Sequence, residues 1–275
     1  MAKTVFLHYT QEELDRNFDQ RGWVSNALEI IGRYPVLSRA TRERLARRTF
    51  AYGATPDEVL DVFPAARSPA PVQIFVHGGA WKNFTKDDFS FVADALVPAG
   101  IHAVILNFSN LPAVRLPDMA EQVQRAFEWV HGQAATFGGD PQRLYVSAHS
   151  SGAHLAALAL QRCDVVRAAT LVSGPYYLEP VVLSARSSYV HLSREEVLAL
   201  SPGLHAGRMR CPVMVGYAEH DTDEFQRQSR QFAASLQDAG RLQKLERFPG
   251  VNHFELMERF GDAGHPLVRG ILEQM

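Results

Sequence analysis

The chain of 275 residues has only two cysteines, Cys163 and Cys211, which lie far apart and form no Cys-x-x-Cys motif. We therefore expect two buried thiols in a reducing compartment rather than a disulfide or a metal-binding pair. No apolar run is long enough to cross a bilayer. Residues 1–10 lack a basic segment followed by a long apolar stretch, so we expect a cytoplasmic protein without a membrane partner.

An excess of charge is also missing. The formal net charge is -2 and the sequence pI is about 6.6, which argues against a broad phosphate-binding face and against nucleic acid as a partner. No H-E-x-x-H motif is present, and His149 and His154 are five residues apart rather than four. The segment Gly138-Gly-Asp-Pro141 has the composition of a turn rather than of a phosphate loop. We therefore expect neither a metal nor a cofactor.

From about residue 58, apolar runs alternate with helical patterns, which predicts an α/β fold with a central, mostly parallel sheet flanked by helices. Runs rich in Val, Ile and Phe predict strands at 72–76, 103–108, 144–148, 168–172 and 213–217, and alternation predicts a half-buried edge strand at 242–248. Helical spacing predicts helices at 89–99, 118–133, 151–162 and 224–239. Asp118, with Glu121 three residues later, resembles a capping box.

We expect one domain over residues 1–275, since α/β folds of this length often have a single core. Residues 1–57 are predicted to form a polar, helical N-terminal segment. Its five arginines from Arg39 to Arg48 are interpreted as a solvated helix face. Residues 174–210 are rich in proline and tyrosine and break the alternation, so we interpret them as a small lid inserted between two strands, with a helix at 194–200.

The segment Leu144-Tyr-Val-Ser-Ala-His-Ser150-Ser-Gly152 predicts a strand, a sharp turn and the start of a helix. A turn this tight exposes the side chain at its apex and leaves N–H groups of the helix N-terminus facing the same space. The pattern resembles the nucleophile elbow of α/β-hydrolases, G-x-S-x-G, with Ala148 in place of the first glycine. Ser150 is therefore the predicted nucleophile.

A serine nucleophile needs a base within hydrogen-bond reach, and the base needs an orienting carboxylate. In α/β-hydrolases the acid and then the histidine follow the serine, each after a strand. Asp221 follows the predicted strand 213–217 and His253 follows 242–248, so we predict a Ser150–Asp221–His253 triad. The alternatives are Glu219, Asp223 and Glu224 for the acid and His265 for the base.

The segment His77-Gly-Gly-Ala-Trp81 directly follows the first predicted buried strand. Its two glycines allow the backbone to turn N–H groups toward a reacting carbonyl oxygen, as in the H-G-G-G-type loop of lipases and esterases. We predict an oxyanion hole made by the N–H groups of Gly79, Ala80 and Ser151.

Four blocks resemble the kynurenine formamidase (arylformamidase) family of serine-dependent α/β-hydrolases. They are His77-Gly-Gly-Ala-Trp81, His149-Ser-Ser-Gly-Ala-His-Leu-Ala156, Asp221-Thr-Asp-Glu-Phe-Gln-Arg-Gln-Ser229 and Val251-Asn-His-Phe-Glu255. The last two blocks support Asp221 and His253 directly. The chain departs from the family pattern at Ala148, at Ser151, where relatives carry alanine, and at Asn107-Phe-Ser-Asn110, where relatives often carry Asn-Tyr-Arg.

The resemblance implies hydrolysis of an N-formyl arylamine through a formyl-enzyme intermediate, with a small-molecule aryl formamide or ester as the partner. Trp81, Ser109, Tyr176 and Tyr177 are predicted to contact this substrate, the aromatic rings by stacking. A carboxylesterase for short acyl esters is the first alternative, and a non-catalytic binding protein on a hydrolase fold is the second. The oligomeric state is left open, with a homodimer as one option.

Overall fold

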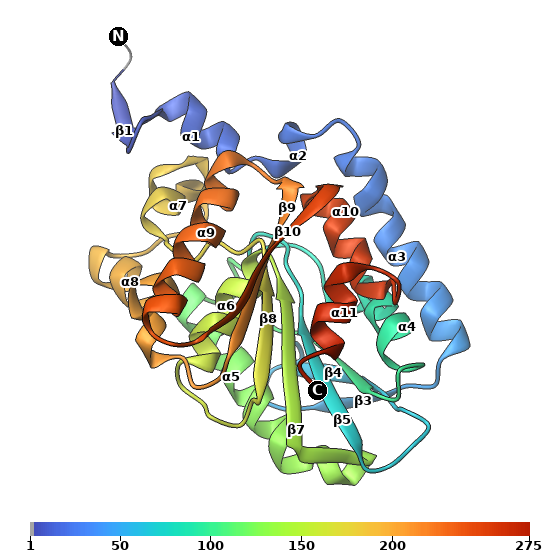
Figure 1. Ribbon diagram of the computed structural model, residues 1–275. Coiled ribbons are helices and arrows are strands. Elements are labelled where there is room, and N and C mark those ends of the chain that lie inside the picture. Colours follow the sequence, from blue (N-terminus) through green and yellow to red (C-terminus); the bar gives the residue numbers. More distant parts are fainter. Residues whose placement is uncertain (1–2) are drawn as a thin grey trace.

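A computed structural model describes residues 3–275, and within them eight strands form one sheet in the order β10-β9-β8-β7-β5-β6-β4-β3 (Figure 1). From β10 to β6 in this order, neighbouring strands are parallel. These strands are β5 (Ala70–Val76), β6 (His102–Leu106), β7 (Gly139–His149), β8 (Ala168–Val172), β9 (Val213–His220) and β10 (Leu242–Asn252). At the other edge, β4 (Val59–Phe63) and β3 (Arg48–Ala51) pair antiparallel. The predicted α/β fold with a mostly parallel sheet is confirmed.

Helices cover both faces of the sheet, so each face has its own apolar core. On one face lie α5 (Leu116–Gln133), α6 (Ser151–Leu160) and α9 (Asp223–Asp238) (Figure 1). On the other face lie α3 (Ala27–Arg44), α4 (Ala93–Leu96), α10 (His253–Glu258) and α11 (Pro266–Leu272). Because the central strands are covered on both sides, they read as continuous apolar runs. The sequence therefore located β5, β6, β7, β8 and β9 by their apolar runs, whereas it located the edge strand β10 by the alternation of apolar and polar residues.

The N-terminal segment is less helical than predicted. It contains α1 (Gln11–Asn17), α2 (Gln20–Trp23) and α3, but also the hairpin of β1 (Thr4–Phe6) and β2 (Tyr9–Thr10), and β3. β3 escaped prediction because an exposed edge strand of four residues carries no apolar run. Of the five arginines between residues 39 and 48, Arg39, Arg44, Arg47 and Arg48 are exposed, as predicted; Arg44 also pairs with Asp94 at 2.8 Å and Arg47 with the buried Asp61 at 2.8 Å.

Two predicted helices have different bounds in the structure. The segment 89–99 forms a 3-10 turn, η2 (Ser90–Val92), followed by the short α4, so its helix is less than half as long as predicted. Helix α5 begins at Leu116 rather than Asp118. The Asp118 carboxylate accepts a hydrogen bond from the backbone N–H of Arg115 at 2.9 Å, because Pro117 occupies the first turn and shifts the cap toward the N-terminus.

Residues 174–210 connect β8 to β9 through α7 (Glu179–Leu183), η4 (Ala185–Ser188), α8 (Arg194–Ala199) and η5 (Pro202–Arg208). The N-terminal segment is attached to this insertion, since Asp15 accepts a hydrogen bond from the N–H of Ala185 at 2.6 Å and Gln11 donates one to the carbonyl of Leu183 at 2.9 Å. In Figure 1, α1 and α2 lie above the end of β9, and α7 and α8 lie beside α9. Cys163 and Cys211 are buried free thiols. Of the helices between residues 3 and 275, none is long and apolar enough to span a bilayer.

Candidate active site

The turn between β7 and α6 places Ser150 at the carboxyl edge of the sheet. Ser150 has φ 57° and ψ −130°, a strained conformation that is typical of a nucleophile elbow. Gly152 is required on the inner side of this turn, because a Cβ there would lie 2.2 Å from the carbonyl oxygen of His77. The close approach of α6 to the end of β5 therefore depends on a glycine at this position.

Ser150, His253 and Asp221 come together from three elements of the sheet edge. The Nε2 of His253 lies 3.0 Å from the Oγ of Ser150, and its Nδ1 lies 2.6 Å from an Oδ1 oxygen of Asp221. All three side chains are at most 7% exposed. The structure thus brings the three residues predicted from the sequence into one hydrogen-bonded line.

The carboxylate of Asp221 is held by two further donors. Its Oδ2 accepts hydrogen bonds from the hydroxyl of Ser173 at 2.6 Å and from the N–H of Ala218 at 2.8 Å. With the carboxylate fixed as an acceptor, Nδ1 of His253 carries the proton and Nε2 presents its lone pair to Ser150. This is the tautomer in which a histidine can accept the proton of a serine hydroxyl.

The alternative acids and base are occupied elsewhere. Glu219 pairs with Arg247 and accepts a hydrogen bond from the N–H of Gly250, while Glu224 pairs with Arg227 at 2.7 Å. Asp223 is exposed at the first turn of α9. His265 caps α11 by accepting a hydrogen bond from the N–H of Leu267 at 3.2 Å.

The loop after β5 faces the elbow. Gly79, Ala80 and Trp81 have φ of 122°, 55° and 62°, so the loop turns through the left-handed region at three successive residues. Within residues 3–275 no hydrogen-bond acceptor lies in reach of the N–H groups of Gly79, Ala80 or Ser151. Three free donors beside a serine hydroxyl are the arrangement that an oxyanion requires.

Two other histidines near the triad are kept neutral by burial. His77 is stacked between the rings of Phe89 and Phe108, and desolvation lowers the pKa of His77 to about 4. The ring of His149 lies 4.5 Å from that of His253. Desolvation, together with the charge that His253 can carry, lowers the pKa of His149 well below its ordinary value. Neither residue therefore places a competing charge next to the triad near neutral pH.

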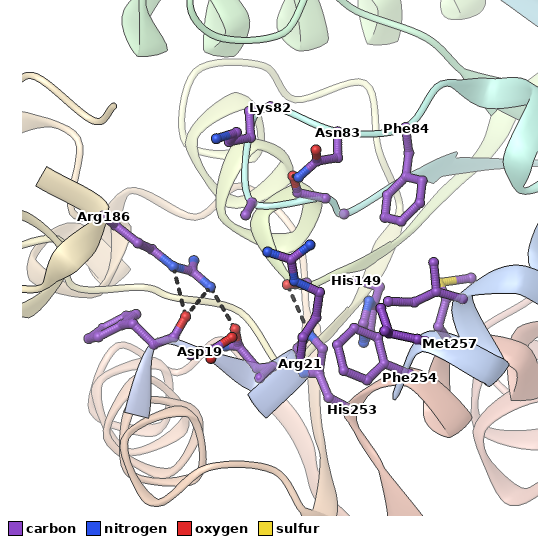
Figure 2. A pocket seen from close by; sticks show the side chains of 18 of the residues that line it. Asp19, Arg21, Lys82, Asn83, Phe84, His149, Arg186, His253, Phe254 and Met257 are labelled. Carbon is purple, nitrogen blue, oxygen red and sulfur yellow. Dashed lines mark hydrogen bonds between the residues drawn. The ribbon is translucent and has the colours of Figure 1, made fainter. Parts of the chain in front are cut away.

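A cavity of about 490 Å³ opens onto Ser150 and His253 (Figure 2). Phe84, Phe254 and Met257 supply apolar surface on one side of it, and Tyr34 also lines it. Arg21, Lys82 and Arg186 supply positive charge. The sequence did not indicate the contributions of α2, α3 and η4, because residues that lie far apart in the chain form this wall only after folding.

Contrary to the prediction, Trp81, Ser109, Tyr176 and Tyr177 are not among the residues that line this cavity. The indole N–H of Trp81 donates to His154 at 3.3 Å, and Ser109 bonds to the side chain of Gln122. Tyr176 is stacked on Phe232 at 4.1 Å. Tyr177 lines a separate groove. All four are at most 8% exposed, so they are packing residues of the core beside the site. Among the described residues, no group of three His, Cys, Asp or Glu side chains could hold a metal ion.

Comparisons with known proteins agree with this geometry. Residues 60–165 match the BD-FAE family. A kynurenine formamidase of Danio rerio is 32% identical over 287 residues, covering 97% of each chain. The esterase LipQ of Mycobacterium tuberculosis is 30% identical over 205 residues, covering 66% of this chain and 48% of LipQ. An esterase of Pyrobaculum calidifontis superposes with a TM-score of 0.72 at 16% identity, covering 96% of both chains, which shows the α/β-hydrolase fold. The chain therefore belongs to the kynurenine formamidase family, and it is an enzyme of the hydrolase class.

Proposed function

We propose that the enzyme cleaves an N-formyl arylamine, an aryl formamide, through a formyl-enzyme intermediate on Ser150. The observation that carries the proposal is the line from Asp221 through His253 to Ser150, with heavy-atom distances of 2.6 and 3.0 Å, beside free N–H donors. The relatedness to a kynurenine formamidase over nearly the whole chain supports a formamide as the substrate.

In the first half of the reaction, His253 takes the proton of the Ser150 hydroxyl as the oxygen attacks the formyl carbon. The carbonyl oxygen becomes negatively charged and is stabilised by the N–H groups of Gly79, Ala80 and Ser151. His253 then donates its proton to the nitrogen of the leaving group. The C–N bond breaks, the neutral arylamine leaves, and the formyl group remains esterified to Ser150.

In the second half, a water molecule attacks the formyl ester with His253 as the base. The C–O bond to Ser150 breaks, the serine recovers its proton from His253, and formate is released. Asp221 orients His253 and stabilises the imidazolium that forms twice in each turnover. Ser150, His253, the substrate and water account for every bond and proton in this reaction, so it needs no cofactor.

A carboxylesterase for short acyl esters is the second candidate, because the same machinery cleaves esters and the chain is also related to the esterase LipQ. A non-catalytic binding protein is less well supported, since Ser150, His253 and Asp221 lie within hydrogen-bond distance of one another in the order that a serine hydrolase needs. We further propose a cytoplasmic enzyme whose partner is a small molecule, and a homodimer remains an option.

Comparison of kcat/KM for formanilide, N-formylkynurenine, phenyl acetate and phenyl butyrate tests the proposal. Measurable turnover of the formamides supports a formamidase, whereas turnover of esters alone supports the second candidate. Labelling by a fluorophosphonate probe, with the Ser150→Ala variant as the control, tests for a reactive serine independently of the substrate. Absence of both labelling and turnover would favour the binding protein.

A further inference from the structure

Ser173 occupies after β8 the position that Ser150 occupies after β7. The sheet register pairs His149, the last residue of β7, with Val172, the last residue of β8, and each is followed by a serine. Both serines have a positive φ, 57° at Ser150 and 51° at Ser173. The N–H of Ser150 donates to the carbonyl of Val172 at 2.8 Å, which ties the end of β7 to β8. The N–H of Ser173 donates in the same way to the carbonyl of Gly216 in β9, also at 2.8 Å.

The conformation of Ser173 is unfavourable for a residue with a side chain. A positive φ strains any residue that has a Cβ, whereas glycine adopts it without penalty. At Ser150 the nucleophile elbow accounts for the strain. Ser173 is fully buried and is not among the residues that line the cavity, so contact with a substrate does not account for it. A serine where glycine would be less strained indicates a role for the hydroxyl.

The hydroxyl of Ser173 acts on the acid of the triad. It donates to Oδ2 of Asp221 at 2.6 Å, the short distance that is typical of a hydroxyl bound to a carboxylate. The N–H of Ala218 donates to the same oxygen at 2.8 Å, while Oδ1 lies 2.6 Å from Nδ1 of His253. Two donors on Oδ2 fix the rotation of the carboxylate about its Cβ–Cγ bond. They thereby fix the direction in which Oδ1 faces the base.

The residue after Ser173 holds the hydroxyl in this direction. A Cβ at Gly174 would lie 2.6 Å from the ring of Tyr176. That ring is fully buried and is stacked on Phe232, with 4.1 Å between the ring centroids, so it cannot move aside at low cost. The sheet on one side and this packed ring on the other leave the chain at Ser173 a single path.

We infer that Ser173 is a positioning residue of the reaction: its hydroxyl fixes the carboxylate of Asp221 and thereby aims His253 at the nucleophile. The inference rests on the proposed function only in taking Ser150 as that nucleophile. Because Ser173 lies behind the triad, it affects the rate of the chemical step and not the binding of substrate. The strain at position 173 lowers stability and is retained because the hydroxyl raises the rate.

Two substitutions separate the hydroxyl from the backbone conformation. Ser173→Ala removes the hydroxyl and keeps the Cβ, whereas Ser173→Gly removes both and relieves the strain. We expect both variants to lower kcat by about tenfold with little change in KM, because a hydrogen bond to a charged group is lost behind the triad. Ser173→Gly should have the higher melting temperature of the two, since glycine alone adopts this φ without strain.

The conservative variant should show the opposite pattern. Ser173→Thr keeps a hydroxyl, so its kcat should stay within about threefold of that of the unaltered enzyme. Its melting temperature should fall, because a β-branched residue is more strained at a positive φ. If Ser173→Thr does not fold, the alanine and glycine variants decide the question alone.

Ser201→Ala is the matched control. Ser201 is a buried serine in the insertion, and its hydroxyl donates to the carbonyl of Val197 at 2.6 Å and accepts from the N–H of Leu178 at 2.9 Å. Its loss removes the same group from the protein interior at a distance from the triad. It should lower the melting temperature and leave kcat unchanged.

The rate constant for labelling of Ser150 by a fluorophosphonate probe separates this test from that of the proposed function. Labelling needs the same base but no formamide, so it should also fall by about tenfold in Ser173→Ala and Ser173→Gly. An enzyme that is labelled but cleaves no formamide would contradict a formamidase and would still report on Ser173. Normal kcat and normal labelling in Ser173→Gly would overturn the inference. A loss confined to KM would overturn it too, because the effect would then lie in substrate binding.

Discussion

The hydroxyl of Ser151 accepts a hydrogen bond from the backbone N–H of Trp81, with 3.2 Å between Oγ and N. The bond joins the first residue of α6 to the loop that carries Gly79 and Ala80. Ala80 and Trp81 both have positive φ, which is unfavourable for residues with a side chain, so the surrounding contacts must hold the loop in place. An alanine at position 151 could not form this contact.

Replacement of Ser151 by alanine should therefore lower kcat more than it changes KM. A hydrogen bond of this kind contributes about 1 kcal/mol, which corresponds to a decrease of about fivefold in kcat if the loop loses its alignment. Steady-state kinetics on any substrate that the enzyme turns over measures the effect. Ser147→Ala is the matched control, because the buried Ser147 hydroxyl in β7 has no hydrogen-bond partner among residues 3–275. A normal kcat for Ser151→Ala would contradict this role.

Ser150→Ala should lower kcat by about 10⁴-fold or more, since it removes the nucleophile while the oxyanion donors stay in place. The side chain is small and lies at a turn, so we expect the melting temperature to change little. Kinetics and thermal denaturation of the same preparation separate loss of chemistry from loss of fold. Residual activity within tenfold of the unaltered enzyme would show that another group is the nucleophile.

Asp221→Asn should lower kcat by about 10⁴-fold at neutral pH, because an amide can turn its NH₂ toward His253 and favour the tautomer with the proton on Nε2. That tautomer cannot accept the proton of Ser150. Glu219→Gln, at the end of β9 two residues before Asp221, is a suitable control, since Glu219 pairs with Arg247 and not with His253. Equal activities of the two variants would mean that Asp221 does not orient the base.

Gly152→Ala should prevent formation of the elbow or strongly destabilise the protein. The added Cβ would lie 2.2 Å from the carbonyl oxygen of His77 and 2.3 Å from that of Val76, and backbone atoms cannot move aside at low cost. In Gly132→Ala, near the end of α5, the corresponding Cβ meets no atom of the described residues within 4 Å. This control should be neutral or more stable by up to about 1 kcal/mol, as helix propensity favours alanine. Urea denaturation of both variants measures the difference.

The stability of the fold should decrease in acid in part because of His154. Its ring accepts a hydrogen bond from the indole N–H of Trp81 and donates one to the carbonyl of Leu200 at 2.8 Å. Desolvation lowers the pKa of His154 from 6.5 to about 4. Between these values the unfolded chain binds a proton that the folded chain does not. The stability that depends on a neutral His154 ring is therefore fully present above pH 6.5 and is lost as the pH falls toward 4.

Between pH 7 and pH 4.5, the free energy of unfolding should fall by about 2 kcal/mol less in His154→Gln than in the unaltered protein. Urea denaturation at both pH values measures the difference, and His8→Gln, at an exposed position, provides the control. An unchanged pH dependence in His154→Gln would show that the buried ring is not the titrating group. His77, whose pKa is also about 4, should contribute independently.

The sequence by itself determined the features that depend on local patterns. Side-chain periodicity located the parallel strands, and small residues around Ser150 indicated a turn that only such residues allow. Chain order then predicted Asp221 and His253, because successive parallel strands bring the loops at their carboxyl ends to the same edge of the sheet. The structure places His253 3.0 Å from Ser150, although the two residues are 103 positions apart.

Only the tertiary structure decided which residues surround the substrate. Trp81, Tyr176 and Tyr177 suit a binding site as well as a core, and local sequence does not distinguish the two because the same rings stabilise both. Arg186 lines the cavity because it bonds to Phe18, 168 positions away, and no periodicity connects two loops so remote from each other. A triad follows from the topology of one sheet, whereas a cavity depends on how separate segments pack against that sheet.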